Sequence, residues 1–183
     1  MQKELVISVM SRDKVGIVAE VTDVINRLGG NLEDVSQTVM RGYFNMILLA
    51  AFPDRVTADA LRQALESSPG LDGAVFGFHD YKPVDGADDG PDGESSLYVL
   101  TAVGQDRPGQ VAAISRYLSG HGVNIVDLAT RINQGDYTMV FLISLPQEVD
   151  IADLRRDLQD EVNGLGLKIE LRHRDIFLRT NEI

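Results

Sequence analysis

The 183-residue sequence contains no cysteine. This absence excludes disulfide bonds, thiolate nucleophiles, iron–sulfur clusters and cysteine-ligated zinc. Positive charge is scarce as well, because 17 Lys and Arg residues stand against 28 Asp and Glu residues, for a formal net charge of −11. Proteins bind nucleic acid largely through cations that neutralise phosphate. We therefore expect no direct binding to nucleic acid.

Long apolar runs are also missing. No stretch approaches the ~18 consecutive apolar residues of a membrane span, and the N-terminus lacks the basic and apolar segments of a signal peptide. We expect a cytoplasmic protein that has no membrane partner. The 44% hydrophobic and 25% charged residues are typical of folded proteins, and they predict a buried core.

The chain repeats itself at a constant offset of 93 residues. Residues 5–53 align with residues 98–146 without a gap, and 12 of the 49 aligned positions are identical. A repeat of this length exceeds the ~20 to 50 residues of solenoid repeats, so each copy should have its own core. We predict a first domain at 1–82, an acidic linker rich in Gly and Pro at 83–95, and a second domain at 96–183.

Apolar spacing predicts the same βαββαβ order in both copies. In the first copy we expect strands over 5–10, 32–40, 43–52 and 74–81, and helices over 15–28 and 58–65. In the second copy we expect strands over 97–103, 124–132, 137–145 and 167–172, helices over 109–118 and 151–161, and a turn at 134–135.

A βαββαβ unit folds as a ferredoxin-like α+β domain, an antiparallel sheet with both helices on one face. The two domains should therefore each leave one sheet face open. An open apolar sheet face is expected to pack against another protein surface. We expect the copies to pair with each other or the chain to form a homodimer.

The corners between strands and helices carry the residues that suit a ligand. Gly16 and Gly109 stand where a helix begins, and the free N–H groups there can accept a carboxylate. Asn31 and Asn124 follow 15 residues later and offer a donor and an acceptor. Together they suit a free amino acid. In the structural alternative, aspartates cap the helices, glycines permit turns and asparagines adopt a left-handed conformation.

Both copies carry D-[KR]-x-G-x-V-A followed by G-x-N-[LI]-x-D, and this pair of motifs resembles the ACT domain, a small-molecule-sensing module. The resemblance implies the ferredoxin-like fold and amino-acid effectors bound at interfaces between ACT units, near the first strand–helix loop and the start of the second strand. Carried onto this sequence, the implied binding residues are Asp13, Val15, Gly16, Asn31 and Leu32 in the first copy, and Asp106, Pro108, Gly109, Asn124 and Ile125 in the second.

The tandem arrangement is similar to the glycine cleavage system transcriptional repressor family, which is thought to act through another protein. This resemblance implies an amino-acid-sensing regulator whose protein partner is a transcription factor. The alternative is a non-catalytic regulatory or adaptor subunit of an amino-acid metabolic enzyme. We expect no enzymatic activity and no cofactor, because the three histidines form no metal-spacing pair and the serines lack a G-x-S-x-G setting.

The two sites should differ in strength. Pro108 stands where the first copy has Val15, and proline fixes the backbone at a helix start before any ligand binds. Gly30 stands where the second copy has Val123, which predicts a looser approach to Asn31. We expect the second site to bind more tightly.

Overall fold

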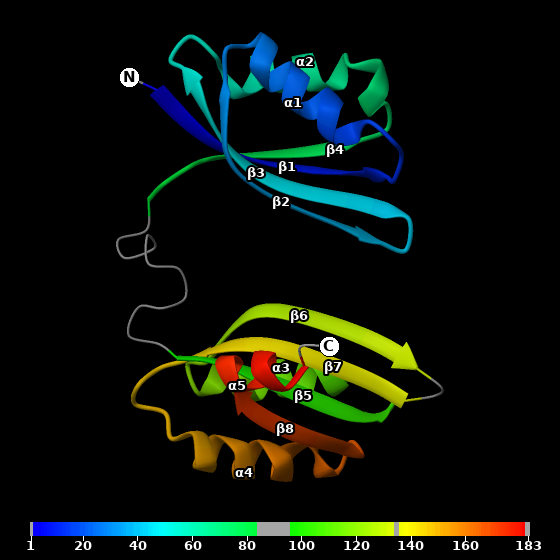
Figure 1. The fold of residues 1–183 in the computed structure, drawn as a ribbon, viewed down its shortest axis with the longest axis vertical. Coiled ribbons are helices and arrows are strands. Elements are labelled where there is room, and N and C mark those ends of the chain that lie inside the picture. The colour runs from blue at the N-terminus through cyan, green and yellow to red at the C-terminus, as the bar shows by residue number, and fades with distance from the viewer. Residues whose placement is uncertain (1, 84–95, 134–135, 182–183) are drawn as a thin grey trace. The chain divides into compact units, whose positions relative to one another are not determined.

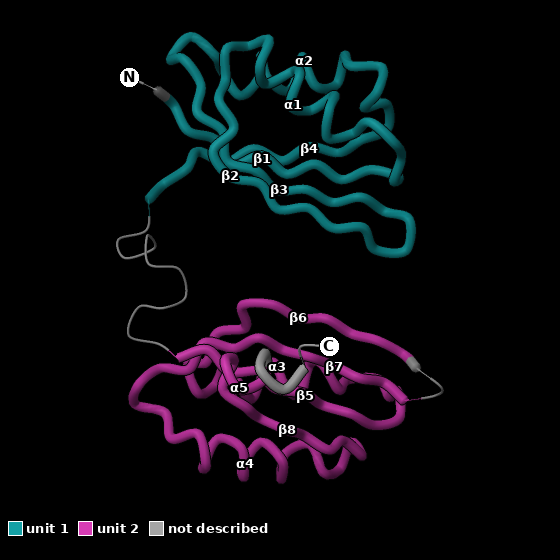
Figure 2. The backbone as a smooth tube through the Cα atoms, in the orientation of Figure 1, with its two compact units in different colours: residues 1–83 teal, residues 84–183 magenta. Residues whose placement is uncertain are grey.

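The computed structural model describes residues 2–83, 96–133 and 136–181. The chain divides into two compact units, residues 1–83 and 84–183, coloured teal and magenta in Figure 2. Beyond Pro83, the predicted linker lies outside the described residues, and so does the predicted turn at 134–135.

Unit 1 has the predicted βαββαβ order, with a short 3₁₀ turn added before its last strand (Figure 1). Its four strands form a sheet in the order β2-β3-β1-β4, and every neighbouring pair is antiparallel. The elements are β1 (Gln2–Arg12), α1 (Ile17–Arg27), β2 (Asn31–Met40), β3 (Tyr43–Pro53), α2 (Ala58–Glu66), the 3₁₀ turn η1 (Pro69–Leu71) and β4 (Val75–Asp80).

Unit 2 repeats this topology with the strand order β6-β7-β5-β8. The ferredoxin-like α+β prediction is thereby confirmed for both units. The elements are β5 (Ser96–Gln105), α3 (Gln110–Gly120), β6 (Asn124–Asn133), β7 (Asp136–Leu145), α4 (Ile151–Asn163), β8 (Leu167–His173) and α5 (Arg174–Asn181). The last helix, α5, is not part of the predicted repeat.

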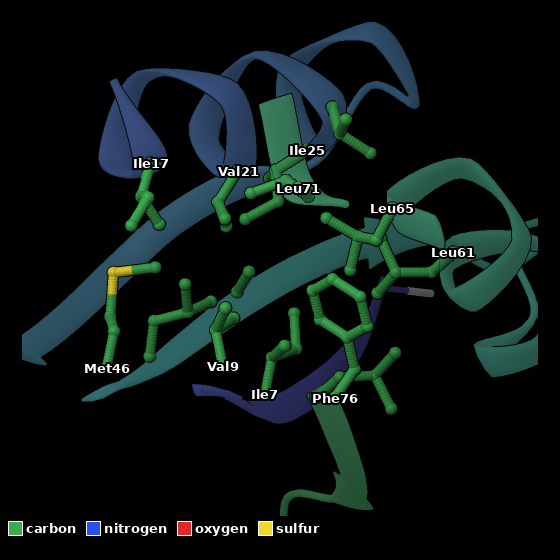
Figure 3. Close-up of a cluster of buried hydrophobic side chains, with 14 of the residues drawn as sticks. Ile7, Val9, Ile17, Val21, Ile25, Met46, Leu61, Leu65, Leu71 and Phe76 are labelled. Carbon is green, nitrogen blue, oxygen red and sulfur yellow. The ribbon is translucent and has the colours of Figure 1, made fainter. Parts of the chain in front are cut away.

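The core of unit 1 lies between the sheet and its two helices (Figure 3). Alternate residues of β1, such as Ile7 and Val9, point into it because side chains of a strand alternate between the two faces. They meet the apolar stripe of α1, represented by Val21 and Ile25, and Leu65 of α2. Each of these fully buried side chains stabilises the fold by about 1.5–3 kcal/mol.

Helix α5 covers part of the open sheet face of unit 2. Leu100 and Ala102 point into the core, so by strand alternation Leu97 and Val99 point to the opposite face. Both are nevertheless buried, at 4% and 6% exposed, and α5 packs against β5 and β8. Figure 1 shows α5 on the near side of this sheet and α3 on its far side.

Candidate functional site

The strand–helix corner of unit 1 ends in a glycine. Gly16 has φ of 98°, a left-handed conformation that favours glycine, and α1 begins directly after it. No side chain caps this helix. The structural alternative in which Asp13 caps α1 is therefore wrong, and the backbone N–H of Asp13 instead donates to the carbonyl of Gly42 at 3.0 Å. Val15 beside it is fully exposed. The corner thus presents an uncapped, positively polarised helix start to a ligand.

The corner of unit 2 has the same shape but is held differently. Gly109 has φ of 90° and no side chain caps α3, so the structural alternative in which Asp106 caps this helix is wrong as well. The next residue, Gln110, is only 1% exposed. Its Nε2 donates to the carbonyls of Gln105 at 2.8 Å and Leu165 at 3.1 Å, and its Oε1 accepts from the N–H of Arg107 at 3.2 Å.

Sequence reasoning missed Gln110. Its counterpart in unit 1 is Ile17, which is buried in the core. A polar residue at a position that is apolar in the other copy is the signal that could have found it, because a buried amide must be hydrogen-bonded.

Asn31 and Asn124 are the first residues of β2 and β6. Among the described non-glycine residues only Arg41 has a positive φ, so the structural alternative with left-handed asparagines is wrong. A β-bulge follows each asparagine, between Leu32 and Asp34 in unit 1. Asp34 Oδ1 accepts a hydrogen bond from the N–H of Val35 at 2.8 Å, and the same contact recurs in unit 2. The repeated aspartates therefore shape the bulge.

The two halves of the predicted site lie at opposite ends of each sheet. β2 is antiparallel to β3 and β3 to β1, so β2 and β1 run in the same direction. The Gly16 corner follows the end of β1, beside Met40, whereas Asn31 stands at the start of β2. The ten residues of β2 separate them by roughly 30 Å. One unit alone does not bring Gly16 and Asn31 together.

One half of the predicted site lines a hollow in each unit, the glycine corner in unit 1 and the asparagine in unit 2. A groove of about 600 Å³ in unit 1 lies between the start of α1 and β2, and sequence reasoning missed its polar wall residue Gln37. Its lining is Asp13, Lys14, Gly16, Ile17, Val18, Ala19, Gln37, Val39 and Phe44. In unit 2 a hollow of about 400 Å³ is lined by Ser115, Ser119, Gly122, Val123, Asn124 and Ile125.

β2 forms an edge of its sheet, and all ten of its residues are exposed. An edge strand leaves a row of backbone N–H and C=O groups without a neighbouring strand. Leu32, Val35 and Val39 add exposed apolar side chains on the helix side of the same strand. This edge is therefore suited to pairing with another strand.

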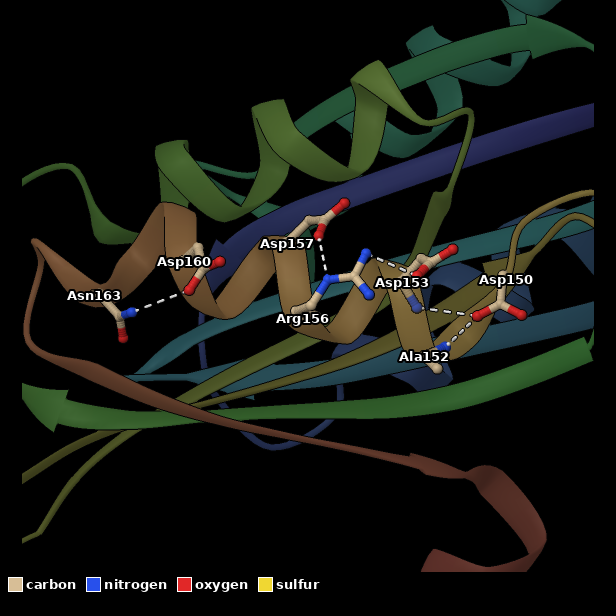
Figure 4. Close-up of polar contacts among 7 residues, drawn as sticks. All are labelled: Asp150, Ala152, Asp153, Arg156, Asp157, Asp160 and Asn163. Carbon is tan, nitrogen blue, oxygen red and sulfur yellow. Dashed lines mark hydrogen bonds and ion pairs between the residues drawn. The ribbon is translucent and has the colours of Figure 1, made fainter.

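The densest polar contacts stabilise a helix and lie outside these hollows (Figure 4). Asp150 caps α4 by accepting from the N–H groups of Ala152 at 2.8 Å and Asp153 at 3.0 Å. Arg156 bridges Asp157 and Asp153, and these hydrogen bonds raise its pKa above the ordinary value. Because these pairs are exposed, solvent screens them and they add little to stability.

Three further observations concern a buried phenol, metal binding and membrane insertion. Burial raises the pKa of the Tyr117 phenol, which lies on α3. Within residues 2–83, 96–133 and 136–181, no group of three or more His, Asp or Glu side chains is arranged to hold a metal ion. No helix in the described part of the chain is long and apolar enough to cross a membrane.

The fold and the repeated corner define a duplicated ferredoxin-like module. Residues 3–72 and 96–172 both match the family model described as the ACT domain. The chain therefore belongs to the ACT domain family, and it is an ACT domain regulatory protein. The resemblance inferred from the two motifs is confirmed.

Small relatives share one unit of this architecture. A UPF0237 protein of Methanosarcina acetivorans is 37% identical over 84 residues, which are 45% of this chain and 91% of the relative. A UPF0237 protein of Pyrobaculum aerophilum is 40% identical over 82 residues, 44% of this chain and 91% of the relative. Their names state no activity.

Two solved structures share the fold over nearly the whole chain. A structure described as an unknown protein from Galdieria sulphuraria superposes with a TM-score of 0.75 at 24% identity, covering 94% of this chain and 99% of that chain. A protein provisionally assigned as a glycine cleavage system transcriptional repressor superposes with a TM-score of 0.61 at 15% identity, covering 94% and 97%.

Proposed function

We propose that this protein senses a free amino acid in the cytoplasm and regulates the transcription of amino-acid metabolism, of the glycine cleavage type, through a protein partner. Membership of the ACT domain family supports a regulatory role. The likeness in fold to a protein provisionally assigned as a glycine cleavage system transcriptional repressor supports the choice of process. The net charge of −11 supports indirect action, because phosphate repels such a chain.

The observation that carries the proposal is the uncapped helix start at each glycine corner, repeated in both units together with an asparagine at the start of the second strand. Helix N-termini bind carboxylates through free N–H groups and the helix dipole. The amide oxygen of Asn31 or Asn124 can accept a hydrogen bond from an ammonium group. Both ends of a free amino acid thereby have partners.

The site is completed by a second copy of the chain. Gly16 and Asn31 stand at opposite ends of β2, a separation much larger than an amino acid. Antiparallel pairing of two β2 edges places the start of one strand beside the end of the other. The corner of one copy then meets the asparagine of its partner copy. The exposed edge supports this arrangement, and the same argument applies to β6.

The first experiment is a thermal-shift screen with each of the twenty amino acids. A ligand at 100 times its Kd stabilises the protein by ~2.7 kcal/mol. We expect the double variant Asn31→Ala and Asn124→Ala to lose the shift, and the exposed control Asn45→Ala to keep it. No shift with any amino acid would refute sensing and favour the adaptor subunit.

A mixing experiment tests the shared site. One variant carries Val15→Glu and Pro108→Glu, which place a repelling carboxylate at both corners, and the other carries the two asparagine substitutions. Each variant alone should not bind. After mixing, mixed dimers contain sites in which an intact corner meets an intact asparagine, so binding should return in part. No recovery would show that the site does not need a second copy.

The route to transcription has its own test. The isolated chain should give no gel shift with DNA at physiological salt, because counterion release contributes little to a chain with this charge. A sequence-specific, salt-sensitive shift would contradict action through a protein partner.

A further inference from the structure

The sheet face of unit 1 that faces away from α1 and α2 carries exposed apolar side chains among polar ones. Strand alternation places Met10, Ile47 and Val75 on this face, and they are 50%, 50% and 61% exposed. Tyr43 and Met40 extend the apolar surface toward the β2–β3 turn. Isolated exposed apolar residues are ordinary, but a contiguous patch marks an interaction site.

The same positions in unit 2 are only partly apolar, because Val103 and Val140 replace Met10 and Ile47, whereas charged residues replace Val75 and Tyr43. The pairing register keeps the offset of the repeat, since Met10 pairs with Val75 and Val103 pairs with Lys168. Several positions on the face change from uncharged to charged between the units. They include Thr38/Arg131, Tyr43/Asp136, Val75/Lys168 and Gly77/Glu170. Unit 2 also covers part of this face with α5. Two sheets of one topology thus differ in what their open faces can contact.

The shape of the face suits a second copy of itself. Ile47 stands between Ser8 and Ser36 on the neighbouring strands, and Gly77 follows beyond Ser8. A hollow of about 280 Å³ is lined by Ile47 together with Val6, Asp34, Val35, Ser36, Leu48, Leu49 and Tyr81. The exposed Ile47 side chain therefore lies beside a shallow hollow. In a two-fold contact, the Ile47 of each copy can enter the hollow of its partner.

The charges at the two ends of the face are opposite. Glu4 and Asp34 stand near one end, whereas Arg12 and Arg41 stand at the other, beside the β2–β3 turn. Two copies packed face to face with antiparallel strands place the acidic end of one over the basic end of the other. The face measures on the order of 500 Å² in projection, comparable with the ~800 Å² per partner of a stable interface.

We propose that this face, defined by Met10, Ile47, Val75, Tyr43 and Met40, is the surface through which unit 1 packs against unit 1 of a second copy, sheet on sheet. The contact is separate from the β2 edge and does not depend on the sensing function. It leaves the corners and the asparagines free.

The test compares one exposed position on the open sheet face of each unit by sedimentation velocity on the full chain. Ile47→Lys in unit 1 should weaken the face-to-face contact at least about 100-fold, because two-fold symmetry places the substitution twice in one interface. The mass of the assembly should therefore halve. The control Val103→Lys lies on the corresponding face of unit 2 and should leave the mass unchanged. Circular dichroism and thermal unfolding of each variant establish that it is folded.

Charge reversal tests the orientation. Glu4→Arg and Arg12→Glu should each weaken association, and the double variant should restore it toward the wild-type level, because the two ends meet across the interface. A monomeric wild-type chain at tens of micromolar would overturn the proposal. So would an unchanged mass for the folded Ile47→Lys variant, or an equal loss with Val103→Lys.

Discussion

The two glycine corners have the same backbone shape but different supports. In unit 1 the residue after Gly16 is Ile17, which packs into the core and makes no side-chain hydrogen bond to the corner. In unit 2 the residue after Gly109 is Gln110, whose amide joins three backbone groups, two at the corner and one before β8. A shared motif therefore specifies the shape of a loop without specifying its rigidity.

The largest expected effect on stability comes from removing the hydrogen bonds of Gln110. Gln110→Leu leaves the carbonyls of Gln105 and Leu165 and the N–H of Arg107 without their side-chain partner. We expect a loss of about 2–4 kcal/mol in the free energy of unfolding of unit 2. Chemical denaturation followed by two-dimensional NMR can assign the loss to one unit. A loss below about 0.5 kcal/mol would mean that water replaces the amide.

The second effect on stability concerns Gly30, the residue before Asn31. A Cβ at Gly30 would lie 2.5 Å from the ring of Phe52 and 2.9 Å from Ile25. Gly30→Ala should therefore destabilise unit 1 by about 1–3 kcal/mol through overpacking. The control Gly120→Ala, where nothing lies within 4 Å, should be neutral or stabilising. Equal unfolding midpoints for both variants would contradict the close contact.

The third effect compares the affinities of the two sites. Asn124→Ala should cost more amino-acid affinity than Asn31→Ala, by ~1 to 3 kcal/mol, because the pinned corner of unit 2 needs less ordering on binding. Isothermal calorimetry with the best amino acid of the screen measures both losses. A larger loss for Asn31→Ala would reverse the comparison, and adding Gln110→Leu should reduce the difference.

The smallest effect is a difference in pH response. Lys3 Nζ lies 2.8 Å from Asp80 and lowers the pKa of that carboxyl, whereas unit 2 has Ser96 and His173 at these positions. Because the folded-state pKa is depressed, the stabilisation is present at neutral pH and is lost as the pH falls through it. NMR titration should show the Asp80 pKa returning toward 3.8 in Lys3→Gln. An unchanged value would exclude Lys3 as the cause.

Much of the fold was predictable because the spacing of apolar residues and the internal repeat indicate the same order of strands and helices. The strand starting at 124 and the helix starting at 151 begin where predicted. Helix α1 begins at Ile17 rather than Val15, because the left-handed Gly16 cannot be its first residue. Helix α5 was missed because it has only eight residues and directly follows β8 without a turn signal.

The candidate site was less predictable because motifs report residue types and omit distances. The glycines behave as expected at φ near 90°, but their place at the far end of the sheet from the asparagines follows only from strand order. The looser approach predicted for Asn31 was wrong, since Gly30 is required by contact with Phe52. The tighter binding of the second site stays a prediction, now supported by Gln110 in addition to Pro108.

Under the proposed sensing function, the distance between Gly16 and Asn31 has a consequence for the response. A site assembled from two copies exists only in the fraction of chains that are associated, so its apparent affinity rises with the amount of protein. By linkage, the ligand in turn strengthens association. A cell that makes more of this protein would then detect a lower amino-acid level, and the threshold of the response would be set by expression as well as by chemistry.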